Sequence, residues 1–395
     1  LALCDWSDVQ RTRRSLARSF CSPRGGSFQQ EELSRIAMLE VTSLLSNLNR
    51  PDNAGVLSGK DPLKPLLLTS LANMFTRYMC STGFDSNDAE FIKIVRAYDE
   101  IFWDINQGYA LDFLPWLKPF YTEILNRLSG WSCDVRSFIL RRIIENRRAT
   151  LDTVNGVPRD LTDALLLHLE SPESGLSPDH VMFELEDFLG GHSAIGNLVM
   201  MILAQAAVNP TVQAKIQDEC DKILATKMNK QSEKKLVCLS DRQDMPYTDA
   251  AIWETLRVCS SPIVPHVASI DTNIDGYAIS KDTVVFINNF ELNLGEIYWG
   301  SDARKFKPER FLKLINNQYR VAKPEHFVPF STGKRTCIGQ KLVQGFAFVV
   351  VTALLSRFDI SPVSDLKSQL LPGCVAVPPD AFHFALKRRR YPNSS

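Results

Sequence analysis

Apolar residues recur at helical spacing through most of the first two thirds of the chain, and short polar or proline-containing segments interrupt them. The clearest start signal is Ser177, followed by Pro178 and Asp179, which is the order of an N-cap, a proline in the first turn and a first-turn acid. Asn209 and Pro210 provide a stop signal. We therefore predict a helix of about thirty residues, which at about 1.5 Å per residue crosses a whole domain.

The remaining pattern predicts shorter elements toward the end of the chain. In chain order these are a helix from Pro246 to Val258, short strands in 263–289 around the turn Asp275-Gly276, a loop-rich region, a helix from Gly339 to Leu355 and a terminal hairpin in 370–386. We find no internal repeat and no low-complexity linker. The sequence thus predicts a single domain over 1–395 that is mainly α with small β-sheets.

Composition limits the class of protein. The sequence has 395 residues, of which 45% are hydrophobic and 23% are charged, so it can bury a large core and is not typical of a disordered chain. Lys and Arg together number 45, as do Asp and Glu, and no net charge attracts the chain to nucleic acid. We expect no nucleic-acid partner.

Cysteine usage and hydropathy bear on the compartment. The nine cysteines are scattered, without a C-x-x-C pair or a zinc-like spacing, so we expect a reducing compartment and neither a disulfide framework nor a structural metal site. No stretch approaches the roughly 18 consecutive apolar residues that span a bilayer. The chain opens at Leu1 rather than at methionine, and we treat its N-terminus as missing.

The stretch "FSTGKRTCIG" at 330–339 places one cysteine just before an apolar run. A helix start offers free N–H groups and the positive end of the helix dipole, which favour the thiolate form of Cys337, and thiolate is a ligand for iron. Gly333 permits a tight turn, Arg335 can pair with a carboxylate on a flat cofactor, and Phe330 can keep water from the sulfur. The alternative, a buried structural cysteine, is disfavoured by this context.

The pattern F-x-x-G-x-R-x-C-x-G resembles the haem-binding signature of cytochrome P-450 enzymes, and it is complete here through Gly339. The resemblance implies haem b as the cofactor, Cys337 as its iron ligand, and the cytochrome P-450 fold without its N-terminal anchor and first helices. Two further family motifs occur in order, E-x-x-R with Glu254 and Arg257, and "PERF" with Arg310. We expect these three side chains to form a buried structural triad; an ordinary surface ion pair is the alternative for E-x-x-R alone.

Other haem contacts follow from the resemblance less directly. The family places a histidine or arginine against a haem propionate in the strand after the E-x-x-R helix, and "VPH" supplies His266 there. The family's W-x-x-x-R helix is only approximated by "WSDVQRTRR", because Gln10 stands four residues after Trp6. Arg11 falls on another face, whereas Arg13 returns to the face of Trp6. We therefore expect Trp6 beside the haem, with Arg13 as its candidate basic partner.

The long predicted helix contains the main departure from the family. The family pattern [AG]-G-x-[DE]-T-[TS] supplies an acid and an alcohol that relay protons during oxygen activation. A gapless match of "GGHSAIGN" keeps Gly190 and Gly191, but it places Ser193 where the acid belongs and Ala194 where the threonine belongs. His192 can titrate near neutrality and is a candidate substitute, although a satisfied polar residue is the alternative. Residues 192 to 194 form the predicted catalytic set.

Other classes of function remain open. "GHSAIG" is one residue away from the G-x-S-x-G elbow of α/β-hydrolases, but that elbow needs glycine in place of Ile195 and a preceding strand in place of a helix. A non-catalytic haem-binding protein, or a haem-thiolate isomerase or dehydratase, fits the loss of the acid and the alcohol better. Turnover with a reductase would separate a monooxygenase from a non-catalytic protein.

The resemblance implies a monooxygenase that uses O2 and electrons from NADPH-cytochrome reductase to oxidise an apolar, sterol-like substrate. "GGHSAIGN" with "NNFELN" at 288–293 looks like the Spook and Spookier group of arthropod enzymes in ecdysteroid hormone synthesis. That group implies attachment to the endoplasmic reticulum membrane through the missing anchor, with the catalytic domain facing the cytoplasm. The substrate-facing residues expected by analogy are Phe188, Gly190, Gly191, Ile263, Val264, Val375 and Val377.

Overall fold

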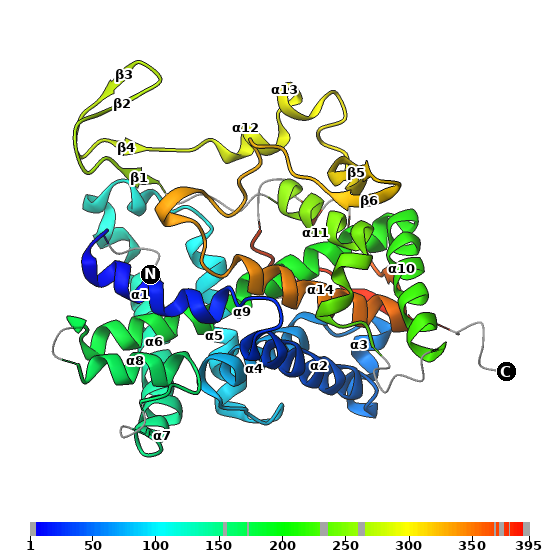
Figure 1. The fold of residues 1–395 in the computed structure, drawn as a ribbon, viewed down its shortest axis with the longest axis horizontal. Helices are drawn as coiled ribbons and strands as arrows, with labels where there is room; N and C mark the ends of the chain where they lie inside the picture. Colours follow the sequence, from blue (N-terminus) through cyan, green and yellow to red (C-terminus); the bar gives the residue numbers. More distant parts are fainter. Residues whose placement is uncertain are drawn as a thin grey trace.

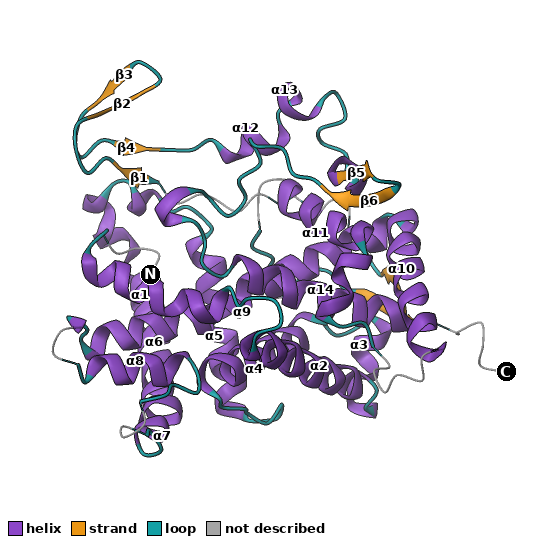
Figure 2. Cartoon of the chain, in the orientation of Figure 1, coloured by secondary structure: helices purple, strands orange, loops and turns teal. Residues whose placement is uncertain are grey.

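The computed structural model describes residues 5–152, 156–171, 174–229, 236–259, 265–366, 369–370, 375–378 and 380–389, and it shows a mainly helical protein with short strands (Figure 1, Figure 2). The predicted fold class is confirmed. The helices are α1 (Asp8–Cys21), α2 (Phe28–Leu48), α3 (Ala54–Ser58), α4 (Lys64–Cys80), α5 (Ala89–Ile105), α6 (Thr122–Phe138), α7 (Glu145–Arg148), α8 (Leu161–Leu169), α9 (Pro178–Val208), α10 (Pro210–Asn229), α11 (Pro246–Val258), α12 (Asn289–Leu294), α13 (Glu296–Trp299) and α14 (Gln340–Arg357). A π-helical segment, Ile139–Ile144, joins α6 to α7, and 3-10 turns lie at Pro51–Asn53, Ala110–Asp112, Pro115–Tyr121, Leu239–Asp244, Pro308–Phe311 and Gly333–Arg335.

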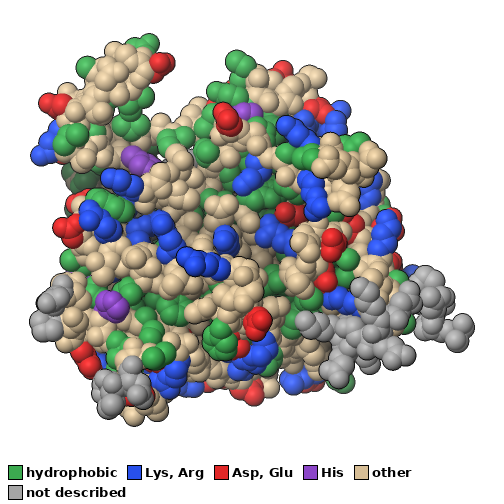
Figure 3. Space-filling model, in the orientation of Figure 1, with side chains coloured by type: hydrophobic (Ala, Val, Ile, Leu, Met, Phe, Trp, Pro, Cys, Tyr) green, Lys and Arg blue, Asp and Glu red, His purple; other side chains and the backbone are tan. Residues whose placement is uncertain are grey.

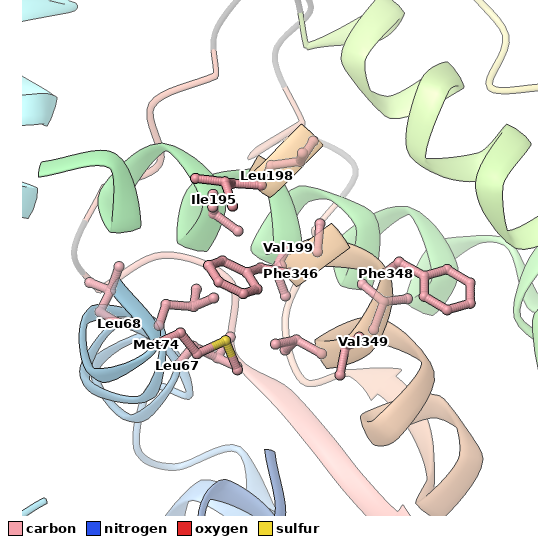
Figure 4. Close-up of a cluster of buried hydrophobic side chains, with 14 of the residues drawn as sticks. Leu67, Leu68, Met74, Ile195, Leu198, Val199, Phe346, Phe348 and Val349 are labelled. Carbon is pink, nitrogen blue, oxygen red and sulfur yellow. The ribbon is translucent and has the colours of Figure 1, made fainter. Parts of the chain in front are cut away.

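α9 is the central helix, and its predicted bounds are confirmed. The Ser177 hydroxyl accepts a hydrogen bond from the His180 N–H (3.3 Å), and the Ser177 N–H donates to Nδ1 of His180 (3.1 Å), so the two residues cap the helix reciprocally. α9 packs against α4, α5, α8, α10, α11 and α14. Figure 4 shows part of this core, formed by Leu67, Leu68 and Met74 of α4, Ile195, Leu198 and Val199 of α9, and Phe346, Phe348 and Val349 of α14.

The apolar content of α9 reflects its burial in this core. Among the described helices, α9 is long and apolar enough to cross a membrane, but 83% of its most apolar window is buried inside the protein. Burying one large aliphatic or aromatic side chain stabilises the fold by about 1.5–3 kcal/mol. Contacts with α4 and α14 therefore hold α9 firmly as the support of the candidate site.

α11 begins where its sequence predicts, and a side chain from α10 completes its first turn. Pro246 occupies the first helical position. The Glu219 carboxylate accepts hydrogen bonds from the N–H groups of Tyr247 and Thr248, both at 2.8 Å, and from the Thr248 hydroxyl at 2.7 Å. An acid at a helix start satisfies free N–H groups and favours the helix dipole. The position of α11 is thus fixed relative to α10.

The strands that the structure describes form four antiparallel pairs. They are β1 (His266–Val267) with β4 (Val284–Val285), β2 (Thr272–Ile274) with β3 (Tyr277–Ile279), β5 (Leu312–Ile315) with β6 (Gln318–Val321), and β7 (Phe358–Pro362) with β8 (Phe384–Arg388). The predicted turn between β2 and β3 is confirmed: Asp275 and Gly276 have φ values of 49° and 87°, as a two-residue hairpin loop requires. Figure 1 shows this hairpin projecting from the helical body.

The sequence predicted a hairpin within 370–386, and for β8, the strand that the structure describes there, this prediction is wrong. β8 pairs with β7, with Phe384 opposite Pro362 and Phe358 opposite Arg388, rather than with a neighbour inside that segment. Residues 371–374 and 379 lie outside the described chain. The sequence pattern identified β8 as a strand, but its partner follows α14 directly and lies more than twenty positions earlier.

One segment places large apolar side chains at the surface. The aromatic residues Phe113, Trp116 and Phe120 are 64%, 68% and 81% exposed. Phe286, just after β4, is 61% exposed, and its ring centroid lies 6.3 Å from that of Phe113. Apolar side chains are also visible on the projecting hairpin in the space-filling view (Figure 3). Exposed aromatic side chains of this kind form a candidate interaction surface.

Candidate haem-thiolate site

The loop before α14 folds back on itself around the cysteine. The Cys337 N–H donates a hydrogen bond to the Phe330 carbonyl (2.8 Å), and the Thr336 N–H donates to the Gly333 carbonyl (3.2 Å). Gly333 has a φ of +69°, which favours glycine, and no atom lies within 4 Å of where its Cβ would be. Phe330 packs edge-on against Trp253 of α11, with a centroid distance of 6.0 Å. The loop is therefore tied both to itself and to α11.

Cys337 lies just before α14, as expected, but its surroundings do not favour the free thiolate. The side chain is exposed on one side, while protein atoms enclose it elsewhere, and this burial raises the pKa of the Cys337 thiol. The N–H groups of Gly339 and Gln340 and the charge of Arg14 act in the opposite direction with smaller effect. The helix-start N–H groups thus favour the thiolate, as expected, but burial outweighs them in the protein alone. A bound cation makes a buried thiol lose its proton.

Two consecutive arginines of α1 connect this loop with α9. The buried Arg13 donates from Nε to the Glu184 carboxylate of α9 (2.8 Å), whereas Arg14 donates to the carbonyl of Thr336 (2.6 Å), the residue before Cys337. Burial, and then the charge of Arg335, lowers the pKa of Arg14. α1 therefore bridges the two sides of the candidate site.

This arrangement adds a second basic candidate on α1. Arg13 was the candidate because it shares a face with Trp6, yet its guanidinium pairs with Glu184. Arg14 was not predicted, although it lies within electrostatic range of both Arg335 and Cys337. Adjacent helical residues differ by about 100° in direction, so the run of two arginines is the sequence signal that allows one of them to reach each neighbour.

The described residues fit a flat dianionic cofactor held by a thiolate. Nδ1 of His266 is buried and has no hydrogen-bond partner within the described part of the chain, so it can donate to a carboxylate. Arg14 and Arg335 supply positive charge near Cys337. Trp6 is 39% exposed, with the Lys334 Nζ 5.7 Å from its ring centroid. The role of each of these residues toward haem stays a prediction.

Glu254 and Arg257 of α11 form a buried, bidentate ion pair. The guanidinium of Arg257 donates to both carboxylate oxygens at 2.7 Å, and both side chains are fully buried. The Lys307 N–H also donates to Glu254 (2.8 Å), and the Arg310 Nε lies 3.6 Å from the same carboxylate. The carbonyl of Asn293 accepts from Arg257 (2.6 Å). The structure thus brings the three predicted triad residues together and joins them to the backbone of α12 and of the loop that contains Lys307.

The three residues predicted to be catalytic, at 192–194 on α9, differ in their exposure to solvent. His192 is buried, its Nδ1 lies 2.5 Å from the Leu189 carbonyl, and its ring packs edge-on against Tyr98 of α5. Burial lowers the pKa of His192, so the ring is neutral near pH 7. Ser193 is fully buried, with its hydroxyl 3.4 Å from Nε2 of His192, whereas Ala194 retains partial exposure. These contacts favour the alternative interpretation, in which His192 is a satisfied polar residue of the core.

The expected substrate-facing residues are also only partly brought together. Gly190 and Gly191 are half-buried, and a Cβ on either would lie 3.2 Å from an aromatic ring, that of Tyr98 or Phe75 respectively. Phe188 of α9 is buried. In a separate segment Val375 and Val377 are also buried, whereas Ile263 and Val264 lie outside the described residues. Val377 is linked to α9, because its N–H donates to the side chain of Asn197 (2.7 Å).

Comparisons with known proteins agree with this geometry. The sequence profile of the family described as Cytochrome P450 matches residues 5–385. The chain is 44% identical to "Cytochrome P450 307a1" of Drosophila melanogaster, over 98% of this chain and 73% of that protein. It is 27% identical to "Steroid 17-alpha-hydroxylase/17,20 lyase" of Ictalurus punctatus, over 91% and 68% of the two chains.

A solved structure shows the same likeness in three dimensions. It is described as "Zebra fish cytochrome P450 another structure with Progesterone", is 26% identical, and has a TM-score of 0.78 over 98% of this chain and 84% of that chain. Among vertebrate relatives, the chain spans between 57% and 69% of each protein's length.

Proposed function

Because the chain belongs to the cytochrome P450 family, we propose that it is a haem-thiolate monooxygenase that oxidises an apolar, sterol-like substrate with O2 and electrons from a redox partner. The observation that carries the proposal is the loop at 330–339, in which the complete family signature folds back on itself and leaves Cys337 exposed just before α14. We also propose that residues 1–395 belong to a single domain.

The residues of this chain would hold haem b in distinct ways. Cys337 would donate its sulfur to the iron, and Arg335, Arg14 and His266 would bind the propionates. Phe330, packed on Trp253, would keep water away from the sulfur. When bound, the haem supplies the oxygen-activating redox chemistry, and the protein supplies orientation and electrostatics.

Proton supply differs from the family pattern. Ala194 carries no hydroxyl, Ser193 is fully buried, and His192 is neutral and engaged by the Leu189 carbonyl. We therefore propose that protons arrive through water admitted beside the half-buried Ala194, or from a hydroxyl of the substrate. A haem-thiolate isomerase or dehydratase also needs no acid and alcohol pair, and O2-dependent turnover distinguishes it from the monooxygenase.

Several observations support a steroid-like substrate. The expected lining residues are mostly small or aliphatic, as an apolar ligand requires. One relative is described as a steroid hydroxylase and lyase, and the solved structure is described with progesterone. The motif resemblance to the Spook and Spookier group agrees with 44% identity to cytochrome P450 307a1 of Drosophila melanogaster. We propose that the substrate is a sterol and that the enzyme acts in ecdysteroid synthesis.

The proposed partner is NADPH-cytochrome reductase, and the proposed location is the endoplasmic reticulum membrane, with the catalytic domain facing the cytoplasm. Exposed Phe113, Trp116 and Phe120 support contact with lipid, because aromatic side chains are favoured at membrane interfaces. The family resemblance supports an anchor preceding this chain.

Spectroscopy tests the proposal directly. Carbon monoxide added to the reduced, haem-loaded protein should give the red-shifted band of a thiolate-ligated haem. Titration with 7-dehydrocholesterol should then shift the haem spectrum with saturation, and palmitate should not. Formation of an oxidised product that requires both O2 and the reductase would complete the assignment as a monooxygenase. A missing red-shifted band overturns the haem-thiolate function, and equal responses to palmitate and the sterol overturn the sterol assignment.

A further inference from the structure

A cluster of buried polar side chains joins α4, α5 and α9. Lys64 begins α4 and Asp99 lies on α5; Nζ of Lys64 is 2.6 Å from Oδ2 of Asp99, and these residues are 1% and 3% exposed. Burying two charges costs more than burying apolar groups of the same size, even when the charges are paired. The adjoining contacts of α4 and α9 are apolar, so packing these helices together does not by itself require the pair.

Asn197 of α9 extends this cluster. Its Nδ2 donates one hydrogen bond to Oδ1 of Asp99 (3.0 Å) and another to the carbonyl of Ser193 (2.7 Å). Both hydrogens of the amide are therefore used. Oδ1 of Asn197 accepts the N–H of Val377 (2.7 Å). The same amide thus connects α5, the centre of α9 and the segment 375–378.

The cluster binds Val377 at both of its backbone polar groups. Its N–H donates to Asn197, and its carbonyl accepts from Nζ of Lys64 (2.6 Å). Residues 375–378 belong to no helix or strand, so no regular ladder positions them. Buried hydrogen bonds to charged groups are stronger than neutral ones, and a fully satisfied network specifies one arrangement. Val377 is thereby held at a fixed place relative to Ser193.

We propose that Lys64, Asp99 and Asn197 are positioning residues that set the shape of the substrate pocket by fixing the backbone at Val377 against the centre of α9. This inference rests on the proposed function, which places Val377 and the residues beside Ser193 in the pocket wall. A ligand long enough to contact this wall depends on its position, whereas a small iron ligand does not reach it. Loss of the cluster therefore weakens binding in proportion to ligand size.

The chain offers a matched control for this idea. Gln213 of α10 binds the backbone of Ile360 in β7 in the same manner, donating to its carbonyl (2.9 Å) and accepting from its N–H (2.7 Å). Asn197→Leu and Gln213→Met each replace an amide with an apolar side chain of similar size. Both changes strand buried backbone groups, but only the first concerns the proposed pocket wall.

The first measurement is hydrogen exchange, which does not depend on catalysis. In Asn197→Leu the amide of Val377 should exchange at least about tenfold faster, because its acceptor is gone. Gln213→Met should accelerate hydrogen exchange at the amide of Ile360 and leave the exchange rate at Val377 unchanged. An unchanged rate at Val377 in Asn197→Leu would show that the cluster does not hold the segment, and the proposal would fail.

The second measurement separates the pocket wall from general stability. The haem-loaded proteins are titrated with imidazole, 1-butylimidazole and 1-dodecylimidazole, and spectral dissociation constants are compared. For Asn197→Leu we expect the dissociation constant of imidazole to stay within about twofold of the value for the parent protein. The dissociation constant of 1-dodecylimidazole should rise about tenfold or more. Gln213→Met should bind all three ligands like the parent. A parent-like dodecylimidazole constant in Asn197→Leu, with faster exchange at Val377, overturns the proposal.

A second variant covers the case in which Asn197→Leu fails to fold. The double substitution Lys64→Met with Asp99→Leu replaces the ion pair by apolar groups, which folded proteins often tolerate. It should show the same loss of selectivity for the longer imidazole, and parent-like binding would overturn the proposal. If the parent protein binds the imidazoles but not the sterol, the sterol assignment alone fails, because the imidazole series still measures the pocket.

Discussion

Replacement of Arg257 by alanine tests whether the triad on α11 is a buried structural network. The substitution leaves the Glu254 carboxylate fully buried, with the Lys307 N–H as its remaining close donor and the Nε of Arg310 at 3.6 Å. It also removes the donor to the Asn293 carbonyl. Removing one partner of a buried ion pair costs about 3–5 kcal/mol, because a charge remains without compensation.

The expected melting shift follows from the size of the protein. Unfolding entropy near 60 °C is about 2.1 cal/mol/K per residue, which for 395 residues makes 1 kcal/mol equivalent to about 1.2 °C. Arg257→Ala should therefore lower the melting temperature by about 4–6 °C. Circular dichroism at matched haem occupancy measures this shift, and the fraction of protein that retains haem should fall as well.

The chain contains an internal control with the same spacing and geometry. On α2, Arg35 donates to both carboxylate oxygens of Glu32 at 2.7 and 2.6 Å, but the side chains are 60% and 30% exposed. Exposed pairs of this kind contribute about 0.5 kcal/mol, so Arg35→Ala should shift melting by less than about 1 °C. If Arg257→Ala melts like Arg35→Ala and keeps its haem, the argument from burial is refuted.

Three further substitutions address the site. Cys337→His should abolish the red-shifted carbon monoxide band, and survival of that band would mean another ligand. Ala194→Thr should not raise product formed per NADPH consumed, because protons do not use a helix alcohol; a large gain would indicate a damaged relay and favour the non-catalytic haem protein. Burial raises the pKa of Glu184 from 4.5 to about 7, so its native form holds the proton more tightly than the unfolded chain. The raised pKa of Glu184 stabilises the folded protein fully below about pH 4.5. This contribution, up to roughly 3 kcal/mol in the free energy of unfolding, is lost as the pH rises through 7. Glu184→Gln should therefore flatten the melting temperature between pH 5 and 7.5, and an unchanged pH slope would contradict this.

Elements with strong local signals could be predicted from the sequence. α9 and α11 begin at their predicted residues, because a cap or a first-turn proline specifies a helix start locally. The turn Asp275-Gly276 was equally predictable, since few residue pairs adopt two positive φ values. The triad also followed from its motifs, because three-residue spacing on a helix directs Glu254 and Arg257 to one face.

Contacts between distant segments could not be predicted in this way. The pairing of β8 with β7 depends on where α14 ends, and strand patterning identifies no partner. Arg13 shares a helix face with Trp6, but whether its side chain is buried against Glu184 depends on how α1 crosses α9. In the structure Arg13 binds Glu184, and Arg14 contacts the cysteine loop. His192 was a candidate proton donor because its type titrates near pH 7, whereas enclosure by α5 decides its state.

The hydrogen bond from Lys64 to the carbonyl of Val377 joins positions 313 residues apart, which has a consequence for biosynthesis. A ribosome releases α4, α5 and α9 long before residues 375–388 leave its exit tunnel. Until then, a nascent chain has Lys64 and Asn197 without the backbone that they later bind, and β7 without its partner strand. Closure of the proposed pocket therefore waits until residues 375–388 have been synthesised. A premature stop codon shortly after α14 would leave the cysteine loop complete and still yield a protein without that wall.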